Sequence, residues 1–296
     1  MIATQSQMTK SPSGISTITR EIVKDKVALI SLIIFVMIGM FVFIATQFFL
    51  DQSEITRVNI LQTFRPPSSE HWLGTDHGGR DVFGQLIIGA RNSMLIGFAV
   101  TLMSAVIGIL FGLIAGYFGG AIDNILMRIL DMFLILPTIM MIIAFVAIVP
   151  GYTIIQFSLM MTAFLWMGTA RLVRSKSLSE TSLDYINASK TLGTSHIKII
   201  GTQLLPNIAS IIVVNITLSL AANIGIESGL SFLGFGFPES TPSLGTLMSY
   251  STNPQIFEAR PWIWLPASIL VLVLMLCINN VGQALKRSID AKQRRA

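Results

Sequence analysis

Few residues in this sequence have the types and the spacing that chemistry at a shared site requires. His71, His77 and His196 lie in polar stretches without the spacing of metal ligands, and Cys277 is the only cysteine. A zinc site needs three or four converging ligands, and an intrachain disulfide needs two cysteines. We therefore expect no catalytic residue, no metal site and no cofactor bound by this chain.

Three charged residues lie inside long apolar stretches: Arg128, Asp131 and Glu227. A charge within a membrane-spanning helix costs about 2.5–3.5 kcal/mol on insertion scales, so it needs a partner or an aqueous surrounding. Arg128 and Asp131 are three residues apart and can pair on one helix face, and Pro137 can kink that helix. Glu227 has no obvious local partner. We expect it to face a bundle interior or an aqueous path, in a structural hydrogen bond or in a substrate or gating role.

The elements that hold these residues follow from composition. Hydrophobic residues make up 52% of the 296-residue chain and charged residues 12%, about half of the 25% that soluble domains carry. This excludes a cytosolic enzyme, a disordered scaffold and a nucleic-acid binder, and indicates an all-α integral membrane protein. A spanning helix needs about 20 apolar residues. Six stretches are predicted to span, the first too long for a signal peptide: residues 27–49, 93–117, 125–149, 153–170, 207–233 and 262–285.

Basic residues orient these spans, because cytoplasmic segments carry an excess of Lys and Arg. Fourteen of the 20 basic residues lie on one side of the predicted membrane, and the other side carries five, outnumbered by seven acids. Both termini are therefore predicted to be cytoplasmic. The predicted parts are a cytoplasmic N-terminal segment (1–26), a first transmembrane helix (27–49), an extracytoplasmic segment (50–92), a core of five transmembrane helices (93–285) with the cytoplasmic loop 171–206, and a basic cytoplasmic tail (286–296).

Small residues recur every four positions along two of the predicted spans. On a helix such a stripe lets another backbone approach closely. Ordinary helix packing and a sliding surface in a protein that changes shape both fit this pattern, and the sequence does not separate them. The stripes are Gly108, Gly112, Gly116 and Gly120 in one span, and Ala221, Gly225 and Gly229 in the other.

The cytoplasmic loop contains a segment of helical character. Residues 184–206 are predicted to form a short helix, a break at Gly193, a second short helix, and a proline, Pro206, that opens the next span. Ile186, Ala188 and Leu192 are apolar within an otherwise cationic loop, which suits insertion of the first helix into a groove on a partner. The sequence has no GxxxxGK[ST] phosphate loop, so any ATPase that drives this protein would be another polypeptide.

This segment resembles the EAA loop of ABC-importer permeases, whose pattern is EAA, three residues, G, nine residues, I, one residue, LP. The glycine and the closing Leu-Pro pair match. Asn187 stands for the glutamate, Ser189 for the second alanine, and Gln203 for the isoleucine. The resemblance implies that the ATPase-coupling residues are Asp184, Tyr185, Asn187, Ala188, Ser189, Leu192, Gly193, Leu205 and Pro206.

Three further segments resemble the peptide/nickel subfamily of these permeases. Residues 71–93 are similar to its GTDxxGRD signature, residues 166–174 to the end of its fourth span, and residues 227–236 to its E..LSFLG.G stretch. From residue types alone, the first segment also suits a turn that opens a helix, with Thr75 or Asp76 as the N-cap. The signature residues are Gly74, Thr75, Asp76, Gly79, Arg80 and Asp81.

The resemblance implies a C-type permease of an oligopeptide, dipeptide or nickel importer, with the type I ABC-importer permease fold, in a bacterial plasma membrane. It implies three kinds of protein partner besides the lipid bilayer and no nucleic acid. These are a homologous B-type permease that shares the translocation path, two cytoplasmic ABC ATPases that bind ATP and Mg, and an extracytoplasmic substrate-binding protein that meets residues 50–92 and 234–261.

Oligopeptides are the first expectation for the substrate, with nickel or another small solute as the alternative. Of the other classes, a self-contained secondary transporter could also have six spans, but the loop with its exposed apolar helix favours a docking partner. A membrane-embedded enzyme would need converging His, Asp or Glu within the spans, where only Asp131 and Glu227 lie.

Overall fold

The computed structural model describes residues 25–149, 151–238 and 240–293, and in these residues the regular structure is helical throughout. Residues 1–24 of the predicted N-terminal segment and the last three residues of the basic tail lie outside this description. Helix α2 begins behind an N-cap at Asp25, whose carboxylate accepts hydrogen bonds from the Val27 and Ala28 amides. The all-α fold predicted from composition is confirmed for the described residues.

By length and composition, four helical runs in the described residues can each cross a membrane. They are α2 (Lys26–Phe48), α4 (Val82–Phe118), the continuous run His196–Phe232, and α14 (Pro261–Gln293). The run His196–Phe232 consists of α10 (His196–Ile199), the π-helical turn η2 (Ile200–Leu204) and α11 (Leu205–Phe232). The predicted second short helix of the cytoplasmic loop is therefore the first turn of a long helix rather than a separate element.

The two remaining predicted spans are interrupted. Residues 125–149 fall on α5 (Gly120–Ile135) and α6 (Thr138–Ile148), which are bent by 76° at Leu136 and Pro137. Proline lacks an amide hydrogen and clashes with the preceding turn, so the predicted kink is confirmed. Residues 153–170 fall on α7 (Ile154–Leu165) and α8 (Met167–Thr181), separated by Trp166. By length and composition, the described residues therefore contain four candidate spans, or five if the bent pair counts as one, and the remaining predicted span contains the shorter apolar helix α7.

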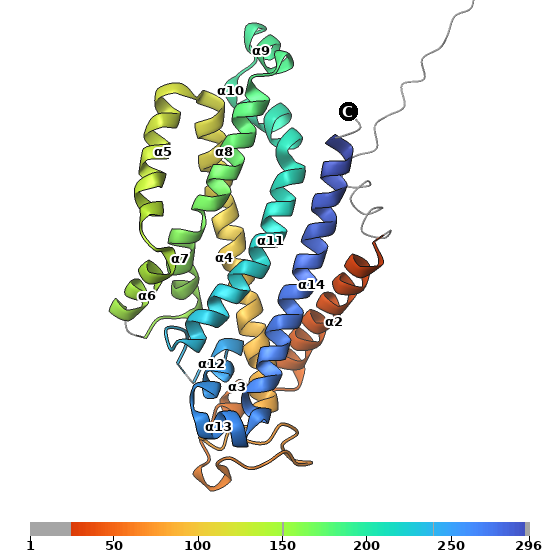
Figure 1. Ribbon diagram of the computed structural model, residues 1–296, viewed down its shortest axis with the longest axis vertical. Helices are drawn as coiled ribbons and strands as arrows, with labels where there is room; N and C mark the ends of the chain where they lie inside the picture. Colours follow the sequence, from red (N-terminus) through yellow and green to blue (C-terminus); the bar gives the residue numbers. More distant parts are fainter. Residues whose placement is uncertain (1–24, 150, 239, 294–296) are drawn as a thin grey trace, which may run out of the picture.

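The helices run back and forth between two ends of the molecule (Figure 1). The start of α2 and the end of α14 lie at one end, where the Asp25 carboxylate pairs with the Arg287 guanidinium. Helices α9 (Asp184–Thr191) and α10 stand at this same end. At the opposite end lie the short helices α3 (Gln52–Ile55), α12 (Leu244–Met248) and α13 (Pro254–Ala259). The segments predicted to be cytoplasmic and extracytoplasmic are therefore separated by the length of the bundle.

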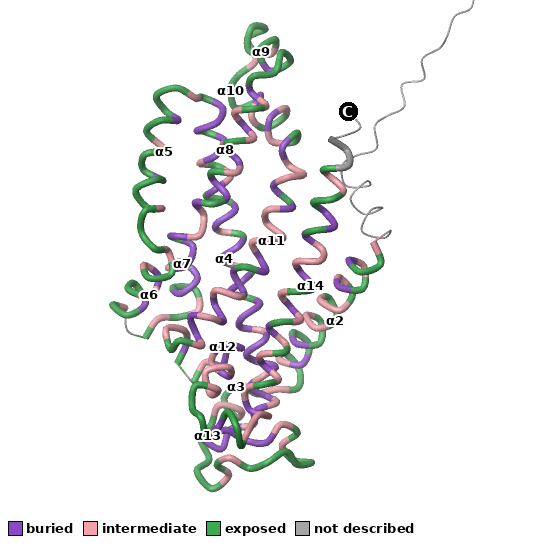
Figure 2. The backbone as a smooth tube through the Cα atoms, viewed as in Figure 1, coloured by how far each residue is buried: buried purple, intermediate pink, exposed green. Residues whose placement is uncertain are grey.

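Helix α4 is the central element, and its glycine stripe packs against α8. A Cβ atom added at Gly108, Gly112 or Gly116 would stand 2.4–2.8 Å from backbone or Cβ atoms of α8 and of Trp166. Gly120 is not part of this stripe, because it begins α5 with a positive φ and has nothing within 4 Å. Figure 2 shows buried residues concentrated along α4, whereas α2, α5 and α6 are largely exposed. The stripe is a close helix contact.

Candidate functional site

The segment predicted to couple to an ATPase protrudes from one end of the bundle (Figure 1). Helix α9 ends at Thr191, and Gly193 has a φ of +77°, the left-handed conformation that glycine adopts without a Cβ penalty. The amides of Gly193 and Thr194 donate to the carbonyls of Lys190 and Ser189, at 3.0 and 3.1 Å. Nothing lies within 4 Å of a Cβ added at Gly193. The predicted break is confirmed, and its glycine is required by conformation rather than by crowding.

The apolar residues of this segment divide between two faces. Ile186 is fully buried in a cluster with Leu113, Val173 and Leu204, so the prediction that it is presented to a partner is wrong. Leu192 is 85% exposed, and Ile197, on the second arm of the turn, is 86% exposed. Ile186 therefore anchors α9 to the bundle, which leaves Leu192 and the exposed Ala188 at the tip.

Polar contacts hold α9 against the long helix. The Tyr185 hydroxyl donates to the Glu180 carboxylate and accepts from the Asn207 amide at 2.7 Å. Partial burial, together with the Glu180 hydrogen bond, raises the pKa of the Tyr185 phenol, so this group stays a neutral donor. Asp184 lies in the first turn of α9 and is exposed, as is Asn187.

Two departures from the loop pattern contact one another. The Ser189 hydroxyl donates to the Gln203 side-chain oxygen at 3.0 Å, so the serine that replaces an alanine is bonded to the glutamine that replaces an isoleucine. Gln203 lies in the π-helical turn, next to the Leu205-Pro206 pair that opens α11. The two residues are fourteen positions apart, and the sequence gives no sign that they pair. The structure shows that the two departures form one polar contact.

Residues at the end of α4 also touch this segment, and sequence reasoning missed them. The Tyr117 hydroxyl and His196 Nδ1 are 2.8 Å apart, and the Lys190 ammonium lies 5.0 Å from the centre of the Tyr117 ring. Tyr117 precedes His196 by 79 positions, and no local pattern marks the pair. The contact joins the start of the long helix and the end of α9 to the central helix α4.

At the opposite end, Asp76 is the centre of a buried polar network. The Asp76 carboxylate accepts hydrogen bonds from the Gly78 amide (2.8 Å), the Arg80 amide (3.0 Å) and Arg80 Nε (2.8 Å). It also accepts from Gln85 Nε2 at 3.0 Å and from the Tyr250 hydroxyl at 3.1 Å. We call Asp76, Arg80, Gln85 and Tyr250 the Asp76 cluster. It connects the segment before α4 to the segment after α12.

The remaining signature residues shape the turn around this cluster. A Cβ added at Gly74 would meet the Arg65 carbonyl at 2.4 Å, and one at Gly79 would meet the Asn59 carbonyl at 1.9 Å; both glycines have positive φ. The Thr75 hydroxyl accepts from the Arg65 amide at 2.8 Å. The positions of Gly74, Thr75 and Gly79 are therefore set by the close approach of residues 59–65.

The N-cap of α4 is Asp81, so the prediction that Thr75 or Asp76 caps this helix is wrong. Asp81 accepts a hydrogen bond from the Gly84 amide at 2.6 Å, and its other oxygen lies 3.0 Å from His71 Nδ1. Thr75 and Asp76 both meet the residue preference for a cap, but their side chains are taken up by the turn. Tyr250 and Gln85 have no signature in the sequence and are recognised only in the fold.

The charges of α5 pair across to α8 rather than along one helix. Asp131 forms an ion pair with Arg171, and Asp123 forms one with Arg174. The predicted Arg128–Asp131 pair is therefore wrong among the described contacts. The two acids face the basic stretch that leads to α9, whereas Arg128 is exposed in a shallow groove on α5 that also contains Asn124 and Asp131.

Glu227 lies in the interior of the bundle, as predicted. Its side chain is fully buried and accepts from the Ser231 hydroxyl at 2.9 Å and the Ser228 hydroxyl at 3.3 Å. Two serines of α11 thus bond to Glu227, which is the structural hydrogen bonding expected of this residue.

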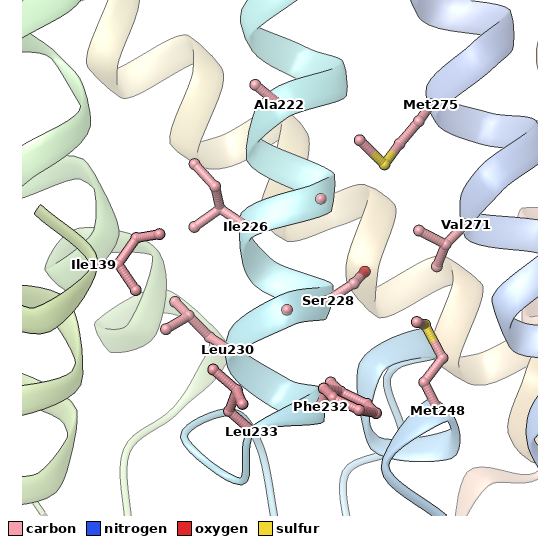
Figure 3. A pocket seen from close by; sticks show the side chains of 12 residues that line it. Ile139, Ala222, Ile226, Ser228, Leu230, Phe232, Leu233, Met248, Val271 and Met275 are labelled. Atoms are coloured by element: carbon pink, nitrogen blue, oxygen red, sulfur yellow. The ribbon is translucent and has the colours of Figure 1, made fainter. Parts of the chain in front are cut away.

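A cavity of about 500 Å³ lies over one face of α11 and is lined in part by Ser228 (Figure 3). Ile139 of α6 borders it on one side, and Met275 of α14 and Met248 of α12 border it on the other. Gly225 and Gly229 contribute bare backbone, and nothing lies within 4 Å of a Cβ added at Gly229. In the described residues, no group of three or more His, Cys, Asp or Glu side chains is placed to hold a metal ion.

Comparisons with known proteins point to one family. Residues 108–292 match the family described as binding-protein-dependent transport system inner membrane component. The chain is 44% identical over 291 residues to the oligopeptide transport system permease protein OppC of Lactococcus lactis, covering 98% of this chain and 99% of the relative. It is 37% identical over 278 residues to the dipeptide transport system permease protein DppC of Bacillus subtilis, covering 93% and 85%.

A solved structure has the same fold. One chain in the inward-facing MetNI methionine ABC transporter superposes with a TM-score of 0.53 at 21% identity, covering 70% of this chain and 97% of that one. At this identity the match describes the architecture and nothing finer.

Proposed function

The chain belongs to the family of binding-protein-dependent transport system inner membrane components, and from this premise we propose how its parts act. It is a multi-pass protein of the bacterial plasma membrane and the permease subunit of an ABC importer for peptides. The observation that carries this function is the 44% identity to an oligopeptide permease over nearly the full length of both chains. Oligopeptides are the substrate class that we propose, with nickel and other small solutes as the weaker alternative.

Energy comes from partner subunits in this proposal. Two ABC ATPases bind ATP and Mg, and one of them docks on α9 and receives its tip, where Leu192 and Ala188 are exposed. A short helix with exposed apolar residues suits a groove on a partner. The chain itself has no GxxxxGK[ST] motif, so we propose that it hydrolyses no ATP.

Movement of α9 passes into the bundle through packed contacts. Ile186 is buried against residues of α4 and α8, and Tyr185 is bonded to both Glu180 and Asn207. Helix α8 directly precedes α9 in the chain and packs on the glycine stripe of α4. A push on α9 therefore reaches α4, α8 and α11 together, and a few kcal/mol of differential contact is enough to shift a two-state equilibrium.

We place the translocation path on the face of α11 that carries the Figure 3 cavity. Gly229 leaves that face open, with nothing within 4 Å of an added Cβ, and Ile139 follows the break at Pro137. A homologous second permease completes the path from the other side. The extracytoplasmic substrate-binding protein docks at the end formed by residues 50–81 and 234–261, which the Asp76 cluster holds together.

The test is uptake by the complete complex. The chain, its second permease, both ATPases and the binding protein are reconstituted in vesicles, and entry of a labelled oligopeptide is measured with and without ATP. We expect ATP-dependent uptake that requires every subunit, and no ATP hydrolysis by the chain alone. Uptake of a nickel chelate in preference to peptides, or transport without the ATPases, contradicts the proposal.

A further inference from the structure

The turn η1 (Ile60–Gln62), between α3 and α4, presents two large apolar side chains at its surface. Ile60 is 82% exposed, and Leu61, at 89%, is more exposed than any other large apolar residue in the described part of the chain. Burial of apolar surface against a partner is favourable in proportion to the area removed from water. The pair therefore offers binding free energy that the fold of this chain does not use.

Hydrogen bonds and close packing hold this turn in one position. The Asn59 amide donates to the Gly78 carbonyl at 2.8 Å, and the Phe64 amide donates to the Asp76 carbonyl at 2.9 Å. The Asn59 carbonyl lies so close to Gly79 that a Cβ added there would stand 1.9 Å from it. The turn is thus mounted on the segment that contains the Asp76 cluster. A backbone that is already fixed loses less freedom when a partner binds, so the apolar pair is pre-organised for docking.

A polar recess of about 640 Å³ adjoins the turn, and Asn59 and Gln62, on either side of the apolar pair, both line it. Glu54, Arg57 and Glu70 line the same recess, are exposed, and form no ion pair among the described residues. An apolar centre with a polar and charged rim is the composition of a protein interface that forms and dissociates.

The position of the turn favours a protein partner over lipid. Helix α2 has 23 residues, about 34 Å at 1.5 Å per residue, which covers a hydrocarbon core of about 30 Å. In Figure 1 the orange segment between α3 and α4 extends beyond the ends of α2 and α14, at the end predicted to be extracytoplasmic. An apolar pair in this segment meets water in the isolated chain, so a protein rather than the bilayer is the partner that buries it.

We propose that Ile60 and Leu61 are the apolar anchor by which the extracytoplasmic substrate-binding protein docks on this chain. The family is binding-protein-dependent, and the turn lies at the end where that protein is proposed to dock. The partner surface that fits the pair is an apolar pocket with charged residues around it, which meet the three exposed charges of the rim. The inference rests on the proposed function, because it requires a binding protein that delivers peptides. It assigns the main docking contact to one turn of a broad surface.

The test is uptake at increasing concentrations of the binding protein. Vesicles contain the complete complex, the binding protein is loaded with a labelled neutral oligopeptide, and the rates give a maximum and a half-saturating concentration of binding protein. We expect Leu61→Ala to raise that concentration about tenfold, or about 1.4 kcal/mol, at an unchanged maximal rate. Leu61→Met, which keeps a large apolar side chain, should behave as the unaltered chain does. Phe49→Ala is the matched control, because it removes an apolar side chain that is 79% exposed at the C-cap of α2.

A second measurement identifies what covers the turn. A photoreactive amino acid in place of Leu61 should crosslink to the binding protein, and a crosslink to lipid or to the second permease instead refutes the anchor. The anchor is also refuted, while peptide transport stands, if Leu61→Ala leaves the half-saturating concentration unchanged, if it lowers the maximal rate alone, or if Phe49→Ala has the same effect. If the unaltered complex takes up peptide equally well without the binding protein, or takes up none, the proposed function fails and this inference fails with it.

Discussion

Replacement of Gly112 by alanine should push α4 and α8 apart. The added Cβ would stand 2.6 Å from the Ala170 carbonyl oxygen, 2.7 Å from the Val173 Cβ and 2.9 Å from the Arg174 amide nitrogen. All three atoms are backbone or Cβ atoms of α8, so no side-chain rotation relieves the contact. The helices must separate by roughly 1 Å to restore ordinary contact distances.

The size of the effect is best measured against Gly168→Ala. Gly168 lies in α8, is exposed, and has nothing within 4 Å of an added Cβ. Both substitutions gain helix propensity, about 1 kcal/mol in each case, so their difference isolates the packing cost. Overpacking of this kind costs about 1–3 kcal/mol. We expect Gly112→Ala to unfold several degrees below Gly168→Ala.

The assay is thermal unfolding of the purified chain in detergent, followed by uptake in the complete complex. Equal melting temperatures for the two variants would refute the close-packing argument. Unchanged stability with a loss of uptake in Gly112→Ala alone would instead favour the sliding surface, which the sequence left open. Loss of both stability and uptake agrees with a fixed contact.

Three further predictions follow from single contacts. Gly193→Leu places a side chain in a left-handed turn and should lower uptake at least tenfold while ATP hydrolysis by the complex continues; equal losses of both, or of neither, contradict the coupling role. Asp76→Asn removes the carboxylate that accepts from Arg80 Nε and Gln85 Nε2 and should cost about 1.5–3 kcal/mol, read as a fall in melting temperature and membrane abundance. The Ser189→Ala and Gln203→Ile substitutions should be non-additive by about 0.5–1.5 kcal/mol in a double-mutant cycle on thermal stability, because the two side chains bond to each other.

Local signals in the sequence were enough to predict the elements that depend on one residue type. The break at Gly193, the bend at Pro137 and the burial of Glu227 each follow from a glycine, a proline or an isolated carboxylate in a known context. The glycine stripe of α4 likewise predicted a close contact, although not its partner α8. Such features are local, so they can be predicted from the sequence before the fold is known.

The sequence did not predict which side chains contact one another in the fold. Asp131 has Arg128 three residues away, yet it pairs with Arg171 forty positions later, because α5 packs with its acids towards α8. Thr75 and Asp76 have residue types that suit an N-cap of α4, but in the fold their side chains are bonded within the turn. The Thr75 hydroxyl accepts from the Arg65 amide, and the Asp76 carboxylate accepts from Arg80 Nε. In both cases the deciding contacts come from the folded turn or from the packing of helices, which the local pattern does not show.

The exposed surfaces of this chain differ in a way that separates lipid from protein. Helix α2 exposes apolar side chains such as Ile33, Met37 and Phe41, which suit hydrocarbon. Helix α5 buries only Asp123 and Leu130 and exposes Arg128, at a position where contact with lipid would cost about 2.5–3.5 kcal/mol. That cost disappears if the α5 face meets water or a polar protein surface. We therefore expect a second permease to pack on the α5 side of the bundle, with α2 turned towards the membrane.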